Sequence, residues 1–469
     1  MLKNTDVQIK SVVLYFIPIQ TRVSLKFGKE TLTEVTCARV CLRIEDRNGN
    51  SAMGWGETPL NVQWAWPSNR PYVERYQHVV SFTRKLAHLY KNFDYVGHPV
   101  EIGYQFIEHV FPRALRQFNT GSMTEPLPRL AGLVCCSPFD LALHDAYGNL
   151  HQLPTYNTYN DNFMNMDLSQ FIAPAIDKNI SFSNLFPERF LNFPLPENIL
   201  AWHLVGGLDC LEDSEVTKHP HDNYPCSLRE WIHRDGLKCL KIKLRGNDVA
   251  WDYERVVRVG TIALEEGVQW LSADFNCMVK DVAYVIEILD RLMRDQPRIY
   301  GMLLYVEQPF PYELEDFPID VRSISARKPL FMDESAHDWR VILRGRELGW
   351  SGVALKTCKT QTGALLSLCW TKAHGLLLMV QDLTHPMLAQ IPHVLLGAHA
   401  GTIMGVESNS MQFYPEASSP EAKVHPGLYQ RRNGCLNLSS VKGNGFGMRV
   451  NEIERELPFP DLVLGDIEV

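Results

Sequence analysis

Eight short apolar runs dominate the second half of the chain and constrain its fold more than any other feature. They cover residues 199–205, 237–244, 270–275, 303–306, 329–332, 353–355, 376–380 and 403–406, and amphipathic segments such as residues 249–266 lie between them. Continuous apolar strands that alternate with helices pair in parallel and are buried on both faces. Eight strand–helix units are the number that closes a (β/α)8 barrel. The sequence therefore predicts an α/β fold built on a TIM-like barrel.

The alternative to a barrel is an open, doubly wound sheet. A dinucleotide-binding sheet of that kind has a Gly-x-Gly-x-x-Gly turn after an early strand. No early strand of this chain is followed by such a turn. The barrel is therefore the favoured architecture.

The residues before the barrel follow a different pattern. Apolar and polar residues alternate along the first 60 residues, and the strand at 35–44 and the turn at 46–50 predict an antiparallel hairpin that ends at 54–58. Residues 72–118 have helical periodicity, and Ser137-Pro138 predicts the start of another helix. Strands followed by helices predict an α+β domain.

These changes of pattern divide the chain into four parts. We expect an N-terminal α+β domain at residues 1–153 and the barrel at residues 199–410. Residues 154–198 are rich in Asn, Phe, Ser and Pro without periodicity, which indicates a connecting insertion. Residues 411–469 form a C-terminal segment that we expect to return to the first domain.

Charge and composition exclude several classes of protein. The chain of 469 residues has a net charge of −8, which gives no electrostatic reason to expect nucleic acid as a partner. The early apolar run at 12–19 is too short for a membrane span and contains Pro18. The 11 cysteines have no metal-binding spacing and are expected to be reduced core residues. We expect a cytoplasmic protein without a membrane partner.

Charged residues follow the predicted barrel strands at the point where each strand ends. They are Lys241 and Lys243, Asp274, Glu307, Asp333, Lys356 and Asp382, and successive strands place them 23 to 33 residues apart. That spacing is about one strand–helix unit, so these side chains converge on the C-terminal face of the barrel. Barrel enzymes have their active sites on this face.

Three of these residues, Asp274, Glu307 and Asp333, are carboxylates on successive strands. Carboxylates that share a site repel one another and require a cation. A ligand set of oxygen atoms, without His or Cys, favours Mg²⁺ over Zn²⁺. The sequence therefore predicts a Mg²⁺ cofactor.

Lysines flank the predicted metal site on two sides. Lys241 and Lys243 are two residues apart on one strand, so both side chains point to the same face. Burial and a cationic neighbour lower the pKa of a lysine, which predicts a general base at this position. Lys356 lies four strands further along the sequence and would approach the metal from the opposite side.

In this order the motifs resemble those of the enolase superfamily, and within it the muconate-lactonizing subgroup of the mandelate racemase and muconate-lactonizing enzymes. The motifs are Gly54-Trp55-Gly56-Glu57, the helix at 139–148, Lys241-Ile242-Lys243, Asp274-Phe275-Asn276, Val306-Glu307-Gln308-Pro309, Asp333-Glu334-Ser335 and Leu355-Lys356-Thr357-Cys358-Lys359. A mandelate-racemase-like site would have an Asp and His pair on strands six and seven. Strand six has Lys356 instead, so that subgroup is disfavoured.

The resemblance implies a reaction and a role for each residue. Asp274, Glu307 and Asp333 would bind Mg²⁺, Lys243 and Lys356 would exchange the α-proton of a carboxylate substrate on opposite faces, and Lys241 would assist. The product of proton removal is an enediolate, and the enzyme would be an isomerase, either a racemase or epimerase or a cycloisomerase. The resemblance also implies that the N-terminal domain caps the barrel, that residues 19–28 form a mobile lid, and that the protein is a homo-oligomer.

Some positions differ from the pattern of the subgroup, so the resemblance does not identify the substrate. Strand seven ends in Gln381-Asp382-Leu383-Thr384-His385 where a Met and a Glu-Ser pair are more usual. The candidate substrate contacts are Asn276, Asp382, His385 and Arg22, and the loop at 206–225 adds His219 and His221. Two alternatives remain: a sugar-acid dehydratase (a lyase) with the same metal site, and a barrel that binds a ligand without catalysis.

Overall fold

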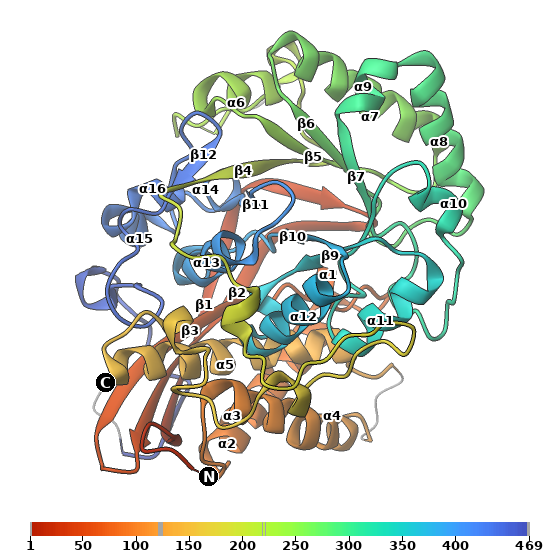
Figure 1. Cartoon of the computed structure of the whole chain (residues 1–469). Coiled ribbons are helices and arrows are strands. Elements are labelled where there is room, and N and C mark those ends of the chain that lie inside the picture. The colour runs from red at the N-terminus through yellow and green to blue at the C-terminus, as the bar shows by residue number, and fades with distance from the viewer. Residues whose placement is uncertain (1, 121–124, 218, 221, 467–469) are drawn as a thin grey trace.

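The N-terminal part of the chain forms an antiparallel sheet (Figure 1). The computed structural model describes residues 2–120, 125–217, 219–220 and 222–466. The sheet contains β1 (Val7–Phe27), β2 (Glu30–Asp46), β3 (Ser51–Pro59) and β13 (Leu462–Leu464), in the order β13-β1-β2-β3. The predicted hairpin is therefore β2–β3, and β1 and the C-terminal segment extend it on one side. Residues 19–28 form the end of β1 and the turn into β2, with a register shift between Gln20 and Leu25.

Helices cover one face of this sheet. They are α1 (Val62–Ala65), α2 (Tyr72–Lys91), α3 (Pro99–Gln105), α4 (Phe111–Asn119) and α5 (Arg129–His151). The prediction that a helix starts at Ser137-Pro138 is wrong, because α5 begins eight residues earlier and contains Pro138 in its interior. Nearly every residue of α5 is buried, so tertiary packing outweighs the local cost of proline.

The barrel follows as eight parallel strands in sequence order. They are β4 (Asn198–Val205), β5 (Cys239–Lys243), β6 (Trp270–Asp274), β7 (Leu303–Glu307), β8 (Leu330–Met332), β9 (Gly352–Leu355), β10 (Leu377–Val380) and β11 (Val406–Glu407). The last strand pairs in parallel with the first, β11 with β4. On the other side of β11, the backbone N–H of Ile403 donates to the carbonyl oxygen of Leu378 at the start of β10. The described residues of β10 and β11 share no strand pairing, and this single hydrogen bond joins the two ends of the row of eight strands.

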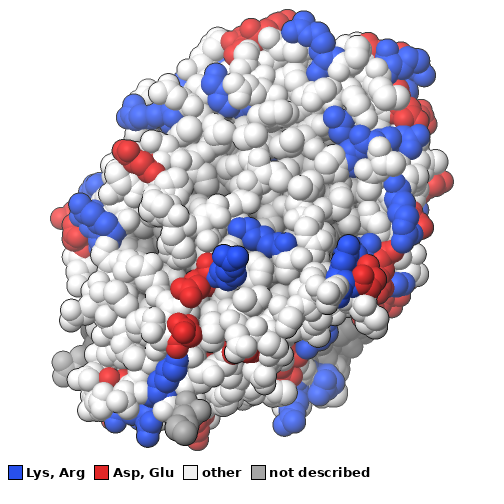
Figure 2. Space-filling model, viewed as in Figure 1, with Lys and Arg blue, Asp and Glu red and all other residues white. Residues whose placement is uncertain are grey.

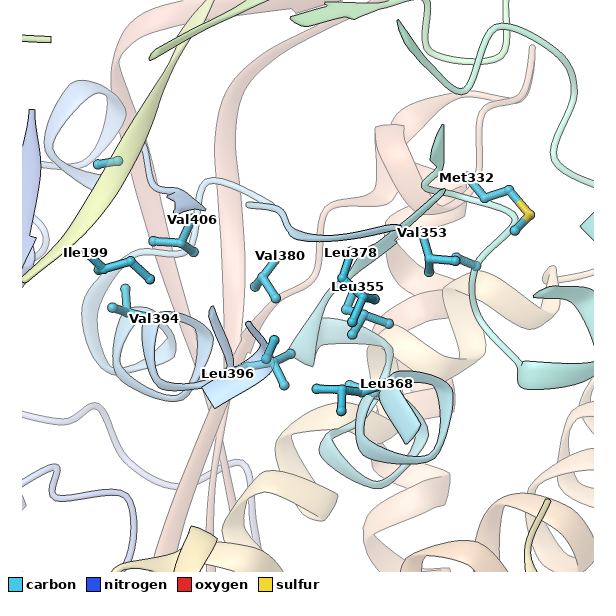
Figure 3. Packing of buried hydrophobic residues seen from close by; sticks show 14 of the residues in the cluster. Ile199, Met332, Val353, Leu355, Leu368, Leu378, Val380, Val394, Leu396 and Val406 are labelled. Atoms are coloured by element: carbon cyan, nitrogen blue, oxygen red, sulfur yellow. The ribbon is translucent and has the colours of Figure 1, made fainter. Parts of the chain in front are cut away.

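Helices surround the strands and bury their outer faces (Figure 1). They are α6 (Leu228–Asp235), α7 (Val249–Glu265), α8 (Val282–Asp295), α9 (Pro297–Met302), α10 (Arg322–Ser325), α11 (Trp339–Leu348), α12 (Gln361–Ala373) and α13 (Gln390–Ala400). Leu368 of α12 and Leu396 of α13 pack with Val380 and Leu355 in this layer (Figure 3). The insertion before the barrel contributes the buried Tyr156 to the same cluster.

A second cluster fills the barrel interior. It contains Trp202, Cys239, Tyr305, Phe331 and Met379, all buried, from five different strands. Side chains two residues apart on a strand share a face, so the residues that follow these by two positions also point inward. The interior cluster thus lies directly beneath the charged residues at the strand ends.

The C-terminal segment connects the two parts of the molecule. It contains α14 (Ser410–Phe413), α15 (Ser419–Val424), α16 (Pro426–Tyr429) and β12 (Cys435–Asn437) before it reaches β13. Among the described residues, no helix is long and apolar enough to cross a membrane. Lys, Arg, Asp and Glu side chains are interspersed on the face shown in Figure 2.

Candidate active site

The carboxylates predicted to bind metal lie side by side at the ends of neighbouring strands. Lys243 pairs in register with Asp274, and Asp274 with Glu307, across β5, β6 and β7. Asp333 follows the last residue of β8. All three carboxylates are at most 1% exposed. The structure therefore brings together the residues that the spacing of the sequence predicts to converge.

Lys241 lies at the centre of this cluster. Its Nζ is 2.7 Å from Oε1 of Glu307, 3.1 Å from Oε2 of Glu407 and 3.2 Å from Oδ2 of Asp274. It also donates to the side-chain oxygen of Gln381 at 3.2 Å. A single ammonium group thus contacts three buried carboxylates.

The other lysines contact the carboxylates from two sides. Lys243 forms an ion pair with Asp274. Lys356, after β9, is 3.1 Å from Oδ2 of Asp333 and donates to the backbone carbonyl of Asp382 at 2.7 Å. In a closed barrel of eight strands β5 and β9 are the second and sixth, so they lie opposite each other.

The lysine pKa values differ from the sequence expectation. Burial opposes the charge of Lys241, but Glu307, Glu407 and Asp274 together raise its pKa well above the usual value. Asp333 likewise raises the pKa of Lys356 against the effect of burial. Of the two lysines on β5, Lys241 is therefore not the one whose pKa is lowered, because carboxylates and not cations are its nearest charged neighbours.

The carboxylate pKa values show an uneven distribution of charge. Burial and the charge of Asp274 raise the pKa of Glu307 well above its ordinary range. For Asp274, the attraction of Lys243 and Lys241 exceeds the effect of burial, and its pKa falls. A buried cluster of carboxylate oxygens matches the ligand preference of Mg²⁺. Asp274, Glu307 and Asp333 are the residues that would hold it.

Sequence reasoning missed four residues of the site. Glu407 at the end of β11 contacts Lys241, and Gln381 donates to both Glu307 and the hydroxyl of Tyr305. Lys359 lies 3.3 Å from Oδ1 of Asp333. Trp64 of the N-terminal domain covers Lys356, with Nζ 5.0 Å from the ring centroid. Glu407 could have been found by applying the rule of charged strand ends to the eighth strand, whereas Trp64 has no signal in the sequence.

The predicted substrate contacts are in three different environments. The backbone N–H of Asn276 donates to Oδ1 of Asp274 at 2.9 Å, so this residue adjoins the metal ligands. Asp382 and His385 form a buried pair behind Lys356, with Nδ1 of His385 2.7 Å from Oδ1 of Asp382. The second oxygen of Asp382 accepts the backbone N–H of Asn409. Both carboxylate oxygens of Asp382 are therefore engaged within the protein.

Arg22 lies at the lid segment and faces the loop after β4. It forms an ion pair with Asp222 and donates to the backbone carbonyl of Tyr224 at 2.8 Å. It lines a separate cavity of about 410 Å³ together with His219. His221 lies outside the described residues. Contact between Arg22 and a substrate stays a prediction that requires the Asp222 pair to open.

Asp382, His385 and His393 are also close enough to form a ligand group, with one candidate atom from each within 4.8 Å of the others. The rings of His385 and His393 are stacked at 4.5 Å with an interplanar angle of 19°. Burial lowers the pKa of His393 to about 3, so this ring is neutral at physiological pH.

Comparisons with known proteins agree with this geometry. Residues 226–454 match the family described as enolase C-terminal domain-like. A comparison with curated protein sequences finds no match. Among solved structures, an N-succinyl Arg/Lys racemase from Bacillus cereus ATCC 14579 has 14% identity and a TM-score of 0.61, with 97% of this chain and 99% of that chain covered.

Two further structures are similar over nearly the whole chain. A mandelate racemase/muconate lactonizing protein from Herpetosiphon aurantiacus has 16% identity and a TM-score of 0.59, covering 94% of this chain and 98% of its own. A dipeptide epimerase from Enterococcus faecalis V583, complexed with Mg and the dipeptide L-Leu-L-Tyr, has 15% identity and a TM-score of 0.60, covering 94% and 99%. The fold class and the resemblance to the enolase superfamily predicted from the sequence are confirmed.

Proposed function

Because residues 226–454 match the enolase C-terminal domain-like family, we propose that the chain is a Mg²⁺-dependent isomerase that removes the α-proton of a carboxylate substrate. The observation that carries this proposal is the placement of Lys243 and Lys356 on opposite strands around three buried carboxylates. Two proton-transfer groups on opposite sides suit a racemase or epimerase, and the same pair suits a cycloisomerase.

Each residue of the proposed active site has a separate role in the reaction. Mg²⁺ held by Asp274, Glu307 and Asp333 would supply Lewis-acid stabilisation of the negative charge on the substrate carboxylate. Lys243, in its neutral form, removes the α-proton from one face and gives an enediolate. Lys356 returns a proton to the opposite face, which inverts the carbon. Lys241 contributes a fixed positive charge next to the developing anion.

The lysines must release their carboxylate partners before they can act as bases. In the structure Lys243 is paired with Asp274 and Lys356 with Asp333. With Mg²⁺ held by these carboxylates, Asp333 would raise the pKa of Lys356 less, so Lys356 could donate a proton to one enantiomer and, in its neutral form, accept one from the other. The metal site and the proton-transfer groups are thus coupled through shared carboxylates.

A dehydratase has less support from the geometry. Asp382 and His385, the predicted polar groups for a sugar-acid pocket, are bonded to each other and are at most 6% exposed. They do not face any of the described cavities. We therefore place isomerisation first.

The test is α-proton exchange in D₂O, followed by proton NMR with Mg²⁺ on pools of N-acyl amino acids, dipeptides and sugar acids. We expect loss of an α-proton signal in the wild type, and no loss with EDTA. Lys243→Ala and Lys356→Ala are expected to lose exchange of opposite enantiomers, whereas the exposed Lys178→Ala is the matched control. Exchange that survives both active-site variants would contradict the proposal.

Homo-oligomerisation and a cytoplasmic location belong to the same proposal. Light scattering coupled to size exclusion measures the first directly. A monomer at micromolar concentration would contradict the proposed homo-oligomer and would leave the proposed reaction unaffected.

A further inference from the structure

A glutamine lies among the charged groups of the active site, at the end of the seventh barrel strand. Gln381 directly follows β10 and is fully buried. Its amide nitrogen donates to Oε2 of Glu307 at 2.5 Å and to the hydroxyl oxygen of Tyr305 at 2.9 Å. Its amide oxygen accepts from Nζ of Lys241 at 3.2 Å. The reaction proposed above gives this residue no role.

These contacts define which way the amide group of Gln381 points. An ammonium group only donates hydrogen bonds, so the atom of Gln381 that faces Lys241 is the amide oxygen. The amide nitrogen is then on the side of Glu307 and Tyr305, and its two hydrogens match these two acceptors. A reversed amide would lose the contact with Lys241. The side chain therefore has a single orientation in this site.

Gln381 also connects strands that are not neighbours. It follows β10, the seventh barrel strand, whereas Glu307 and Tyr305 belong to β7, the fourth, and Lys241 belongs to β5, the second. Tyr305 is part of the buried interior cluster, and its ring centroid is 4.6 Å from that of Phe331. The hydroxyl of Tyr305 is thus a fixed point, against which the amide of Gln381 can hold Glu307 from across the barrel.

A neutral donor is well suited to orient a metal ligand. A carboxylate oxygen accepts more than one contact, so Oε2 of Glu307 can accept from Gln381 and still face a cation. The ammonium group of Lys241 repels a cation, whereas the amide has no charge. Carboxylates that bind metals are usually oriented by such outer hydrogen bonds. We propose that Gln381 is a positioning residue that holds Glu307 in place for Mg²⁺. This inference rests on the proposed function for the metal itself.

The Mg²⁺ affinity of the full chain without substrate, measured by calorimetric titration, tests this inference. Gln381→Met keeps most of the side-chain volume but removes the amide. We expect it to bind Mg²⁺ about 10- to 100-fold more weakly than the wild type, the usual effect of losing an outer partner of a metal ligand. Gln361→Met is the matched control, because Gln361 is equally buried and donates to the hydroxyls of Tyr156 and Tyr159 in the insertion before the barrel. It should keep the wild-type affinity.

Tyr305→Phe is a milder second variant. It removes the other acceptor of the Gln381 amide and leaves the aromatic ring in the interior cluster. Among the described residues, the Tyr305 hydroxyl bonds to Gln381 and has no hydrogen bond to Glu307, so its effect on Mg²⁺ binding would pass through Gln381. We expect the Mg²⁺ affinity to fall about threefold, as for the loss of one neutral hydrogen bond. The unfolding free energy in EDTA, measured on the same variants, separates this role from a general loss of packing, which Gln361→Met would share.

Several results would overturn the inference. One is a Mg²⁺ affinity of folded Gln381→Met that is higher than that of the wild type or within about threefold of it. Another is an equal loss of affinity in Gln361→Met. If Gln381→Met does not fold, an unchanged affinity in Tyr305→Phe refutes the inference. A wild type that binds no Mg²⁺ would refute the proposed metal site and this inference together, whereas equal binding by wild type and Gln381→Met refutes the inference alone.

Discussion

Replacement of Lys241 by methionine removes the charge at the centre of the active site while it keeps most of the side-chain volume. The ammonium group contacts Glu307, Glu407 and Asp274 within 3.2 Å and is 1% exposed. Without metal, Lys241→Met leaves these carboxylates buried with no central cation. We expect the protein to lose about 3–5 kcal/mol of unfolding free energy in EDTA, the usual cost of removing one partner of a buried ion pair.

Mg²⁺ should restore part of this loss, because it neutralises two of the same carboxylates. In the wild type the cation and Lys241 compete for Glu307 and Asp274, whereas in Lys241→Met the cation is alone. Mg²⁺ should therefore stabilise the variant more than the wild type, by about 3 kcal/mol. That difference corresponds to about a hundredfold tighter apparent binding.

The measurement is the midpoint of urea unfolding, followed by tryptophan fluorescence with EDTA and with Mg²⁺. Lys243→Met is the matched control, since the one ion pair of Lys243 among the described residues is with Asp274 and its side chain is 10% exposed; we expect a smaller loss. The reasoning is refuted if Lys241→Met in EDTA is within about 1 kcal/mol of the wild type. It is also refuted if Mg²⁺ stabilises both proteins equally.

Three further perturbations test other parts of the molecule. A methyl group at Gly56 would lie 2.1 Å from a backbone carbonyl oxygen of α5, so Gly56→Ala should cost about 3 kcal/mol in thermal unfolding, whereas Gly301→Ala, which meets nothing within 4 Å, should be nearly neutral. Burial raises the pKa of Asp140 from 3.8 to about 6. The protonated carboxyl therefore stabilises the fold fully below pH 3.8, and this stabilisation is lost as the pH rises through 6. Asp140→Asn does not titrate, so it should lose about 3 kcal/mol less stability than the wild type over this pH window. Arg22→Ala removes the ion pair with Asp222 and should speed proteolysis in the loop at 206–225 about tenfold.

Each of these has a contrary result. Equal melting temperatures for the two alanine variants would show that α5 moves aside freely. Identical pH profiles of stability for wild type and Asp140→Asn would exclude this carboxyl as a source of the pH dependence. Unchanged cleavage in Arg22→Ala would mean that the loop is held by contacts other than the arginine.

Much of the barrel could be predicted because its signals are local. Seven of the eight apolar runs contain a strand of three or more residues, whereas the run at 403–406 contributes only Val406 to β11. The strand direction alone places the charged residues at the strand ends at the barrel mouth. This is why Asp274, Glu307, Asp333 and Lys356 converge in the structure as expected. Glu407 follows the eighth run, which ends at Val406, and so has the same position relative to its strand as the predicted charged residues, but it was not predicted.

The remaining errors come from information that is not local. The Ser137-Pro138 pair has the local pattern of a helix start, but the burial of the preceding residues extends α5 back to Arg129. The pKa of Lys241 depends on Glu407, which is 166 residues away. Trp64 and Lys356 come from different domains, so their contact does not follow from any single segment.

The pairing of β13 with β1 has a consequence for how the protein is made. Leu14 of β1 pairs with Leu462, and a ribosome adding about 5–20 residues each second needs roughly 20 to 90 s to synthesise the intervening chain. During that time one edge of β1 has no strand beside it, and an open strand edge is a template for pairing with other chains. Self-association of nascent chains should therefore be most frequent in this interval, and it should end when residues 462–464 emerge.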